Sequence, residues 1–336
     1  MARKLLIIGA LASIYLLWGS TYLAIAIGLK SFPPFILMGL RSLCGGTVLI
    51  ALCGGEIART SRRTWLNASL CGLLFFVGCH GVLAWAEQTV SSGVAAIVLA
   101  TIPFWILLND FLSAKHDRPS VYALAVLLPG FVGVAIVAWQ NVTVAGASLV
   151  SIIALLAASL SWSVGTVLSR NTSGEASTTL LSGVQLLVGG VALFATAAFT
   201  GEMRNFSATA VSAASLEALV YLTLTGSVIG FAAYHWLLKN VPTQLVASYT
   251  FINPIVAVAL GITVLGEPVS APMISGAILV VLSIIAMWGA ECFGAPSAPP
   301  LGRSIASAAA TARKPACRPA RDGTAACRRY RSQSAA

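Results

Sequence analysis

Ten apolar segments follow one another through most of this chain, and short polar connections separate them. About 20 apolar residues in an α-helix span the hydrocarbon layer of a bilayer, and inside lipid only helices and closed barrels satisfy their own backbone hydrogen bonds. We therefore predict an all-α integral membrane protein. The ten predicted transmembrane helices cover residues 5–27, 34–54, 65–86, 90–113, 120–139, 146–169, 179–200, 212–237, 243–265 and 270–290.

The composition agrees with this class. Hydrophobic residues make up 58% of the 336 residues and charged residues only 9%, against roughly 25% charged in a soluble domain. The net charge of +10 raises nucleic acid as a partner, but the basic residues lie mostly in short loops and near the C-terminus. The first span follows Arg3 and Lys4 as a signal peptide would, yet it is longer than a signal core and has no clear cleavage site. We expect it to remain as a mature helix.

The basic residues also predict the orientation of the bundle. With the N-terminus inside, the outer loops carry only Lys30 and Arg204. Because positive residues are retained on the cytoplasmic side, we expect a multi-pass protein of the cell inner membrane with both termini cytoplasmic. The inner loops then carry nine basic residues, which are Arg3, Lys4, Arg59, Arg62, Arg63, Lys115, Arg118, Arg170 and Lys239.

Two stretches of the chain share one layout of a helix end, a polar turn and an apolar helix with a proline. They begin at Trp85 and Trp236, 151 residues apart, and the same offset aligns Pro103 with Pro254. Such self-similarity predicts two repeats, residues 1–140 and 146–290, with five spans each. Since five is odd, the repeats have inverted topology, as in many secondary transporters with a midplane site.

Residues 291–336 are rich in Ala, Pro, Arg and Ser and lack apolar periodicity. We predict a disordered basic tail, because this composition buries too little apolar surface to offset the entropy of ordering. Contact with anionic lipid is the alternative.

The seven cysteines show no CxxC or Cys/His spacing, so we expect no disulfide framework, no metal site and no cofactor.

Four short motifs carry a family resemblance: Trp18-Gly19-Ser20, Arg41 after Pro33-Pro34, the paired Pro103 and Pro254, and Gly266-Glu267. Over residues 5–290 the chain resembles a ten-helix transporter of the drug/metabolite transporter superfamily with two EamA-type domains. It departs from that pattern at Lys115–Arg118, where Asp117 is the candidate replacement for the acid of the Gly-Glu motif. The resemblance implies transport of small metabolites, often amino acids or drug-like compounds, commonly outward.

Arg41 is the most informative single residue, because a charge inside an apolar span costs about 2.5–3.5 kcal/mol on insertion scales. It is predicted to meet an anionic group of a substrate or a carboxylate such as Glu217. The alternative is a structural role, in which Arg41 snorkels or binds backbone carbonyls.

Aromatic residues on helical faces predict a wall for an organic solute. Tyr15, Trp18 and Tyr22 share one face of the first span, and helix packing or interfacial anchoring is the alternative explanation. The predicted substrate-binding residues are Arg41, Trp18, Tyr22, His80, Trp105, Trp162, Tyr249 and Asn253.

Glu217, Asp110 and His235 are candidates for proton coupling. A desolvated carboxyl group takes up and releases protons at a raised pKa, and histidine titrates near neutrality. Interfacial solvation of the acids and hydrogen-bonded packing of the histidine are the simpler alternatives.

Pro103 and Pro254 each remove a helical hydrogen bond. Broken helices at corresponding places of inverted repeats indicate a midplane site. We predict that spans four and nine bend near these prolines and face one another across the solute cavity, with Tyr249 and Asn253 on one side and Trp105 on the other. The alternative is two tolerated kinks buried in packing.

Together these features predict a secondary active transporter of a small organic solute, with export as the expected direction and alternating access as the mechanism. The alternatives are a membrane-embedded enzyme and a receptor or assembly protein. The repeat favours the transporter, since it supplies two exchangeable halves around one site.

Overall fold

The structure, a computed structural model, describes residues 2–53, 56, 60–112, 127–143, 148–172 and 176–294. Within these residues every regular element is a helix. The connection that contains Lys115–Arg118 lies outside the described residues, as does the predicted tail beyond residue 294.

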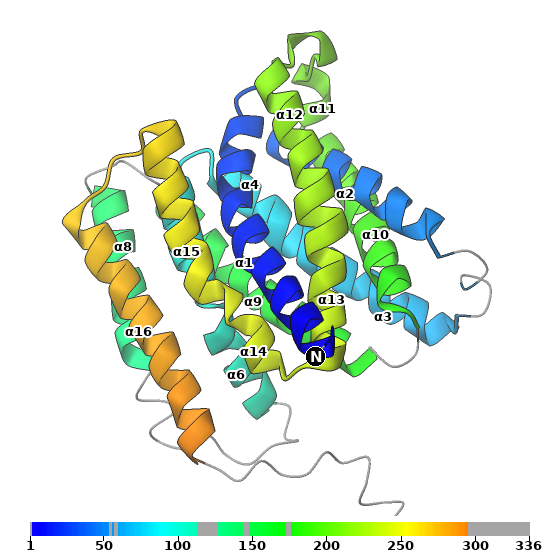
Figure 1. The fold of residues 1–336 in the computed structure, drawn as a ribbon. Coiled ribbons are helices and arrows are strands. Elements are labelled where there is room, and N and C mark those ends of the chain that lie inside the picture. Colours follow the sequence, from blue (N-terminus) through cyan, green and yellow to red (C-terminus); the bar gives the residue numbers. More distant parts are fainter. Residues whose placement is uncertain are drawn as a thin grey trace, which may run out of the picture. The chain divides into compact units, whose positions relative to one another are not determined.

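The helices of the first half follow in chain order (Figure 1). The third span is continuous through α3, a π-helical segment η2 and α4. The elements are α1 (Ala2–Gly28), α2 (Pro34–Ala51), α3 (Arg62–Gly72), η2 (Leu73–Gly81), α4 (Val82–Ala86), α5 (Ser92–Leu99), α6 (Ile102–Leu112) and α8 (Leu127–Thr143).

The second half repeats this order and adds a short helical excursion between its second and third spans. Its elements are α9 (Leu149–Thr172), α10 (Thr178–Phe199), α11 (Glu202–Asn205), η3 (Ala208–Ala210), α12 (Ala213–Tyr221), η4 (Leu222–Ile229), α13 (Gly230–Asn240), α14 (Thr243–Ala247), α15 (Tyr249–Leu260), η5 (Gly261–Leu265) and α16 (Ala271–Gly294).

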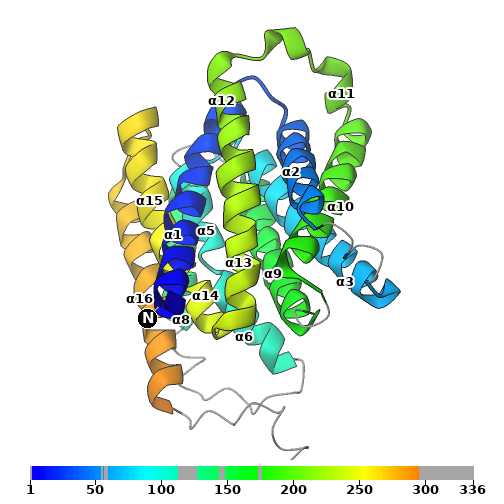
Figure 2. The same ribbon diagram turned by 45° about the vertical axis from the view of Figure 1, so that its right-hand side comes forward.

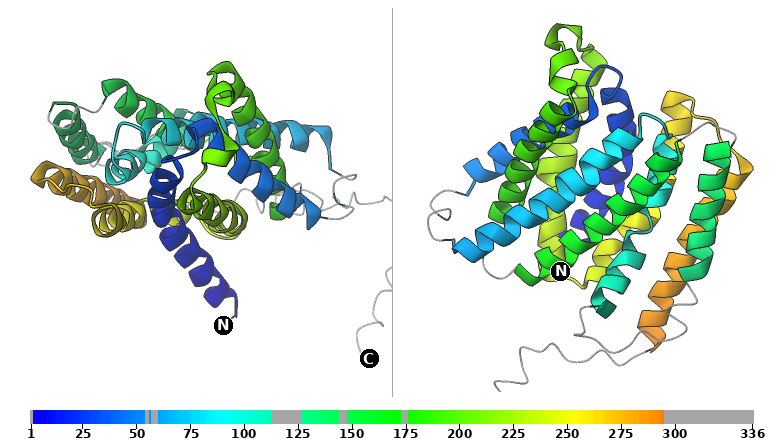
Figure 3. Two further views of the ribbon diagram at one scale, coloured as in Figure 1. Left: turned by 90° about the horizontal axis from the view of Figure 1, so that it is seen from above. Right: turned by 180° about the vertical axis from the view of Figure 1, so that it is seen from behind.

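Eight helical stretches of the described chain are long and apolar enough to cross a membrane. Two shorter apolar helices, Leu128–Gln140 and Ala271–Ser283, fall at the predicted fifth and tenth spans. They lie side by side, as α8 and α16, in Figures 1 and 3. The prediction of an all-α membrane protein with ten helices is confirmed.

The third span of each half contains a π-helical segment, η2 in the first half and η4 in the second. A π-helix is formed by hydrogen bonds between residues five apart; it is rare and is frequently found at functional sites. Its presence at the corresponding place in both halves supports the internal repeat.

Spans four and nine are both interrupted, and the sequence predicts a bend near the proline of each. The first interruption lies between Leu99 and Ile102, so that Pro103 is the second residue of α6. The second lies at Ser248, between α14 and α15, and Pro254 is inside α15. The break therefore lies directly before Pro103 but more than a helical turn before Pro254.

Candidate functional site

Four aromatic rings from four helices meet in the middle of the bundle. Trp18 on α1 contacts Trp162 on α9 edge to face, with ring centroids 5.4 Å apart. Its centroid is also 5.1 Å from that of Tyr234 on α13 and 5.0 Å from that of Tyr249 on α15. All four side chains are buried. Both halves of the chain thus contribute to one aromatic cluster.

The cluster continues along the third span of each half. Phe75 on η2 lies 4.6 Å from Trp162 and 5.5 Å from Phe231 on α13. His80 stacks on Phe76 and meets Trp162 edge to face at 5.2 Å. The π-helical segment η2 therefore presents three rings to the same interior.

Few polar groups border these rings, and most are paired. Trp18 Nε1 donates to the Gly226 carbonyl oxygen at 3.2 Å. In the amide orientation that satisfies its hydrogen bonds, Asn253 Nδ2 donates to the carbonyls of Tyr249 and Tyr15, both at 3.1 Å. Trp162 Nε1 is an exception, since it is buried and has no hydrogen-bond partner among the described residues.

Arg41 is buried beside the cluster, with only 2% of its surface exposed. Its Nε donates to Ser227 Oγ at 3.0 Å, and Nη1 points to Met38 Sδ at 3.7 Å. Nη2 lies next to Gly226, where an added Cβ would be 2.8 Å away. Glu217 is exposed on α12, and no carboxylate within the described part of the chain pairs with Arg41.

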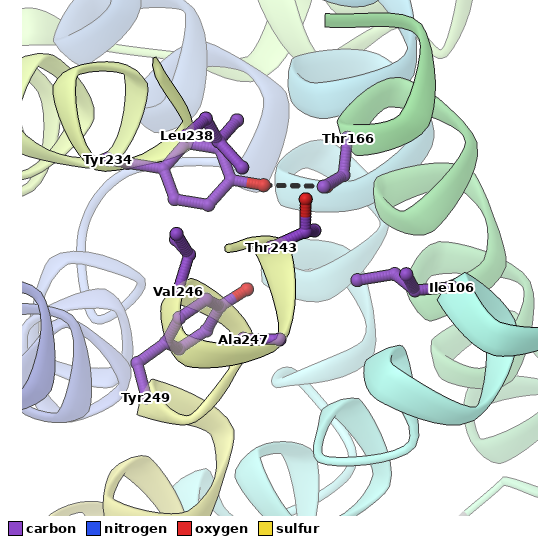
Figure 4. A pocket seen from close by; sticks show the side chains of 8 residues that line it. All are labelled: Ile106, Thr166, Tyr234, Leu238, Thr243, Val246, Ala247 and Tyr249. Atoms are coloured by element: carbon purple, nitrogen blue, oxygen red, sulfur yellow. Dashed lines mark hydrogen bonds between the residues drawn. The ribbon is translucent and has the colours of Figure 1, made fainter. Parts of the chain in front are cut away.

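A narrow pocket opens between these rings and the interruptions of spans four and nine (Figure 4). Its empty space is about 160 Å³ and is divided into gaps narrower than a water molecule. The Tyr234 hydroxyl reaches across it to Thr166 Oγ1 at 2.6 Å. This pocket therefore has no room for a solute in this structure. Its lining is Ile106, Thr166, Tyr234, Leu238, Thr243, Val246, Ala247 and Tyr249.

Comparison with known proteins agrees with this architecture. The profile of the EamA-like transporter family matches residues 5–139 and again residues 149–289. The chain belongs to the EamA-like transporter family. Since the profile matches once per half, each half is one EamA repeat.

Two relatives of this chain are named as transporters. The Escherichia coli K12 protein named "Uncharacterized inner membrane transporter YedA" is 34% identical over 275 residues, 80% of this chain and 86% of YedA. The Bacillus subtilis protein named "Uncharacterized transporter YvbV" is 25% identical, over 82% of this chain and 88% of its own length. A solved crystal structure superposes with a TM-score of 0.63 at 19% identity, covering 85% of this chain and 98% of that one, which supports the fold alone.

The structure brings together most of the predicted substrate-binding residues. Trp18, Trp162, Tyr249, Asn253 and His80 lie in or beside the aromatic cluster, and Arg41 and Tyr22 are buried nearby. Trp105 does not join them, because its ring lies against Phe131 on α8 at 6.2 Å.

The proton-coupling candidates lie in different environments. His235 is buried, and its ring nitrogens lie 3.0 Å from Ser169 Oγ and from the Phe231 carbonyl oxygen. Asp110 lies on α6, but its side chain is outside the described residues. Glu217 is exposed, as interfacial solvation would require.

Sequence reasoning missed Tyr234, Phe75 and Phe231, which are central to the cluster. A signal was available, because Phe231 and Tyr234 are three residues apart and therefore share a helical face. Apolar rings in an apolar span, however, do not stand out from lipid-facing residues. Only the packing of the two halves against one another distinguishes the rings of the cluster from lipid-facing rings.

The Gly266-Glu267 motif has a structural explanation. Gly266 adopts a left-handed conformation, with φ of 66°, and ends η5. Glu267 then accepts hydrogen bonds from the backbone N–H and the hydroxyl of Ser92, both at 3.0 Å, at the start of α5. A carboxylate at the start of a helix binds the unpaired N–H groups there, and its negative charge interacts favourably with the helix dipole. The motif thus connects the end of span nine to the start of span four.

Glu87, directly after α4, lies close to this connection. Burial raises the pKa of Glu87 well above its usual range, and the negative charge of Glu267 adds to the effect. Neither carboxyl oxygen of Glu87 has a hydrogen-bond partner among the described residues. A carboxyl group in this setting favours its protonated form.

Proposed function

We propose that this protein is a secondary active transporter that exports a small organic solute by alternating access. The support comes from the aromatic cluster, in which Trp18 of the first half and Trp162 of the second half share one site. A site built from both of two inverted repeats can open to either side of the membrane when the halves exchange conformations. The transporter names of the relatives agree with this proposal.

The chemistry of the site supports a solute with an apolar or aromatic body and an anionic or acceptor group. Rings of Trp and Tyr provide flat apolar surface with few polar groups. Arg41 provides a buried positive charge without a protein counter-charge in the described chain. A buried charge without a partner is costly, so an anion that binds there gains the interaction that the protein leaves open. This observation carries the proposal.

Transport assays with purified protein in proteoliposomes test this proposed solute chemistry. The solutes should form matched sets with one body and a carboxylate, a neutral amide or an amine, and each set should be measured with and without a pH gradient. We expect the carboxylates to be transported, and Arg41→Gln to abolish that preference. Equal transport of all three members, or transport of none across a broad panel, would refute the proposed chemistry. The gradient arm also tests coupling to protons.

The same proposal assigns transport to the two repeats, residues 1–140 and 146–290, and no essential role to residues 291–336. Truncation after Phe293 should leave membrane insertion and transport largely intact. Loss of the inserted protein would show that the C-terminal residues are needed.

A further inference from the structure

Helices α2 and α10, the second spans of the two halves, pack along one another (Figure 2). A Cβ added to Gly46 would lie 2.9 Å from Leu187 N, and a Cβ added to Gly190 would lie 3.0 Å from Leu43 N. The two contacts are equivalent under exchange of the repeats, because residues 43 and 187 are 144 apart and so are residues 46 and 190. The backbones therefore approach closely through the same residues on both helices.

The reciprocity extends toward both ends of the pair. An added Cβ would meet Phe194 from Gly39 at 2.8 Å and Ile50 from Gly183 at 2.9 Å. Residues 39 and 183, and residues 50 and 194, again differ by 144. The interface thus obeys an approximate two-fold axis, as a self-complementary contact does in a dimer.

A glutamate that follows each helix of the pair accepts hydrogen bonds from backbone N–H groups at the start of the other helix. Glu202, after α10, accepts from Phe35 N at 3.0 Å and Ile36 N at 3.3 Å at the start of α2. Glu56, after α2, accepts from Ser177 N at 2.7 Å at the start of α10. Because Pro33 and Pro34 have neither a capping side chain nor an N–H, the first donors of α2 are those that Glu202 binds.

Spans four and nine do not obey this symmetry. On the α5 side they are tightly packed, since a Cβ added to Gly93 would lie 2.9 Å from Val258 Cγ2. The corresponding place on the other side, between α6 and α14, is occupied by the pocket lined by Ile106 and Val246 (Figure 4). One end of this interface is therefore in direct contact, whereas the other end holds narrow gaps between its side chains.

Inverted repeats reach the opposite-facing state by exchanging the conformations of the two halves. An interface with two-fold symmetry maps onto itself in that exchange and need not change. An interface that is closed at one end and loose at the other must reverse. We infer that α2 and α10 form the fixed part of this transporter, and that the contact of α5 with α15, held by Glu267 on Ser92, is the gate that opens. This inference rests on the proposed transport by alternating access.

Two disulfide locks test the assignment, in protein whose seven native cysteines are replaced. Leu43→Cys with Gly190→Cys joins the fixed pair, and Gly93→Cys with Val258→Cys joins the gate. In both pairs one substitution removes side-chain atoms that the other would meet. Hydrogen–deuterium exchange of α5 and α14 measures opening without any solute, and the reduced protein of each variant is the control.

We expect the gate lock to slow exchange in α5 by at least about tenfold, a difference of roughly 1.4 kcal/mol in opening. The lock on α2 and α10 should leave that exchange within about twofold of the reduced protein. Equal slowing by both locks, or slowing by the α2–α10 lock alone, would overturn the assignment. If exchange behaves as expected but no solute in the panel is transported, the proposed function fails and the assignment of fixed and moving helices stands.

Discussion

Trp18 and Trp162 meet edge to face at 5.4 Å, although 144 residues separate them. The same separation relates the residues of the α2–α10 interface, so the two tryptophans are equivalent residues of the two repeats. Arg41 and Gln185 are related in the same way. Gln185 is buried and uncharged, so the two repeats match in this tryptophan pair but differ in charge at the position of Arg41.

Replacement of either tryptophan of this pair should impair transport. Trp18→Phe keeps a ring but removes the donor to the Gly226 carbonyl oxygen, and we expect transport to fall by at least about tenfold, or roughly 1.4 kcal/mol. Trp162→Phe should have a similar effect. Trp139→Phe is the control, since that side chain is 75% exposed. Solute flux per inserted molecule is the measurement, and normal flux in both site variants would exclude the cluster as the solute site.

Arg41→Gln should separate stability from transport, because it gives the first half the residue that the second half has at Gln185. The variant loses a buried charge that costs several kcal/mol when uncompensated, so its melting temperature should equal or exceed that of the wild type. Its transport of carboxylates should fall sharply. Arg41→Lys should retain part of the transport, as a point charge remains. A variant that unfolds would instead assign Arg41 to the fold.

The pH dependence of stability should reveal Glu87 and Glu56 with opposite signs. The raised pKa of Glu87 means that the folded state holds its proton more tightly, so stability falls as the pH rises from about 4.5 to the folded pKa. Hydrogen bonding by Ser177 lowers the pKa of Glu56, so its contribution is present above about 4.5 and is lost as the pH falls through the folded pKa.

Melting temperatures measured at about every pH unit between pH 3 and 9 test this assignment. Glu87→Gln should flatten the decline on the alkaline side, and Glu56→Gln should flatten the decline on the acid side. Identical profiles for wild type and both variants would contradict it.

Glu267→Ala should destabilise the junction of spans four and nine. The variant leaves the Ser92 N–H at the start of α5 without its acceptor, and loss of a helix cap costs about 0.5–2 kcal/mol. Hydrogen exchange in α5 should increase, while exchange in α2, which is capped by Glu202, should not change. A uniform increase in exchange over all helices would indicate that Glu267 stabilises the whole fold and does not act as a local cap of α5.

Both termini should be cytoplasmic, because the predicted inner loops carry nine basic residues and the outer loops two. Reporter fusions after Arg63 and after Glu291 should both give cytoplasmic signals. A periplasmic signal from either fusion would reverse or break the topology.

The class, the number of spans and the repeat could all be predicted from the amino-acid sequence. Chain composition and segment length are enough for this, since lipid admits only helices or closed barrels and sets the length of a helix that crosses it. Pro103 also marked the interruption of span four, because proline lacks a helical donor and is tolerated at the start of a helix. Pro254 indicated the right span but not the place of its interruption, which lies at Ser248. These constraints are local and need no knowledge of neighbouring helices.

Which apolar residues form the aromatic cluster depends on how the helices pack together. Tyr234 and Phe75 face the cluster, whereas Trp105 faces Phe131, and nothing in the local sequence distinguishes these orientations. The partners of Glu56, Glu202 and Glu267 were equally hidden, since each carboxylate binds a helix start more than 100 residues away in the sequence. In lipid, interior and exterior are both apolar. Hydrophobicity therefore predicts that a helix spans the membrane, and only packing between helices shows which face it turns inward.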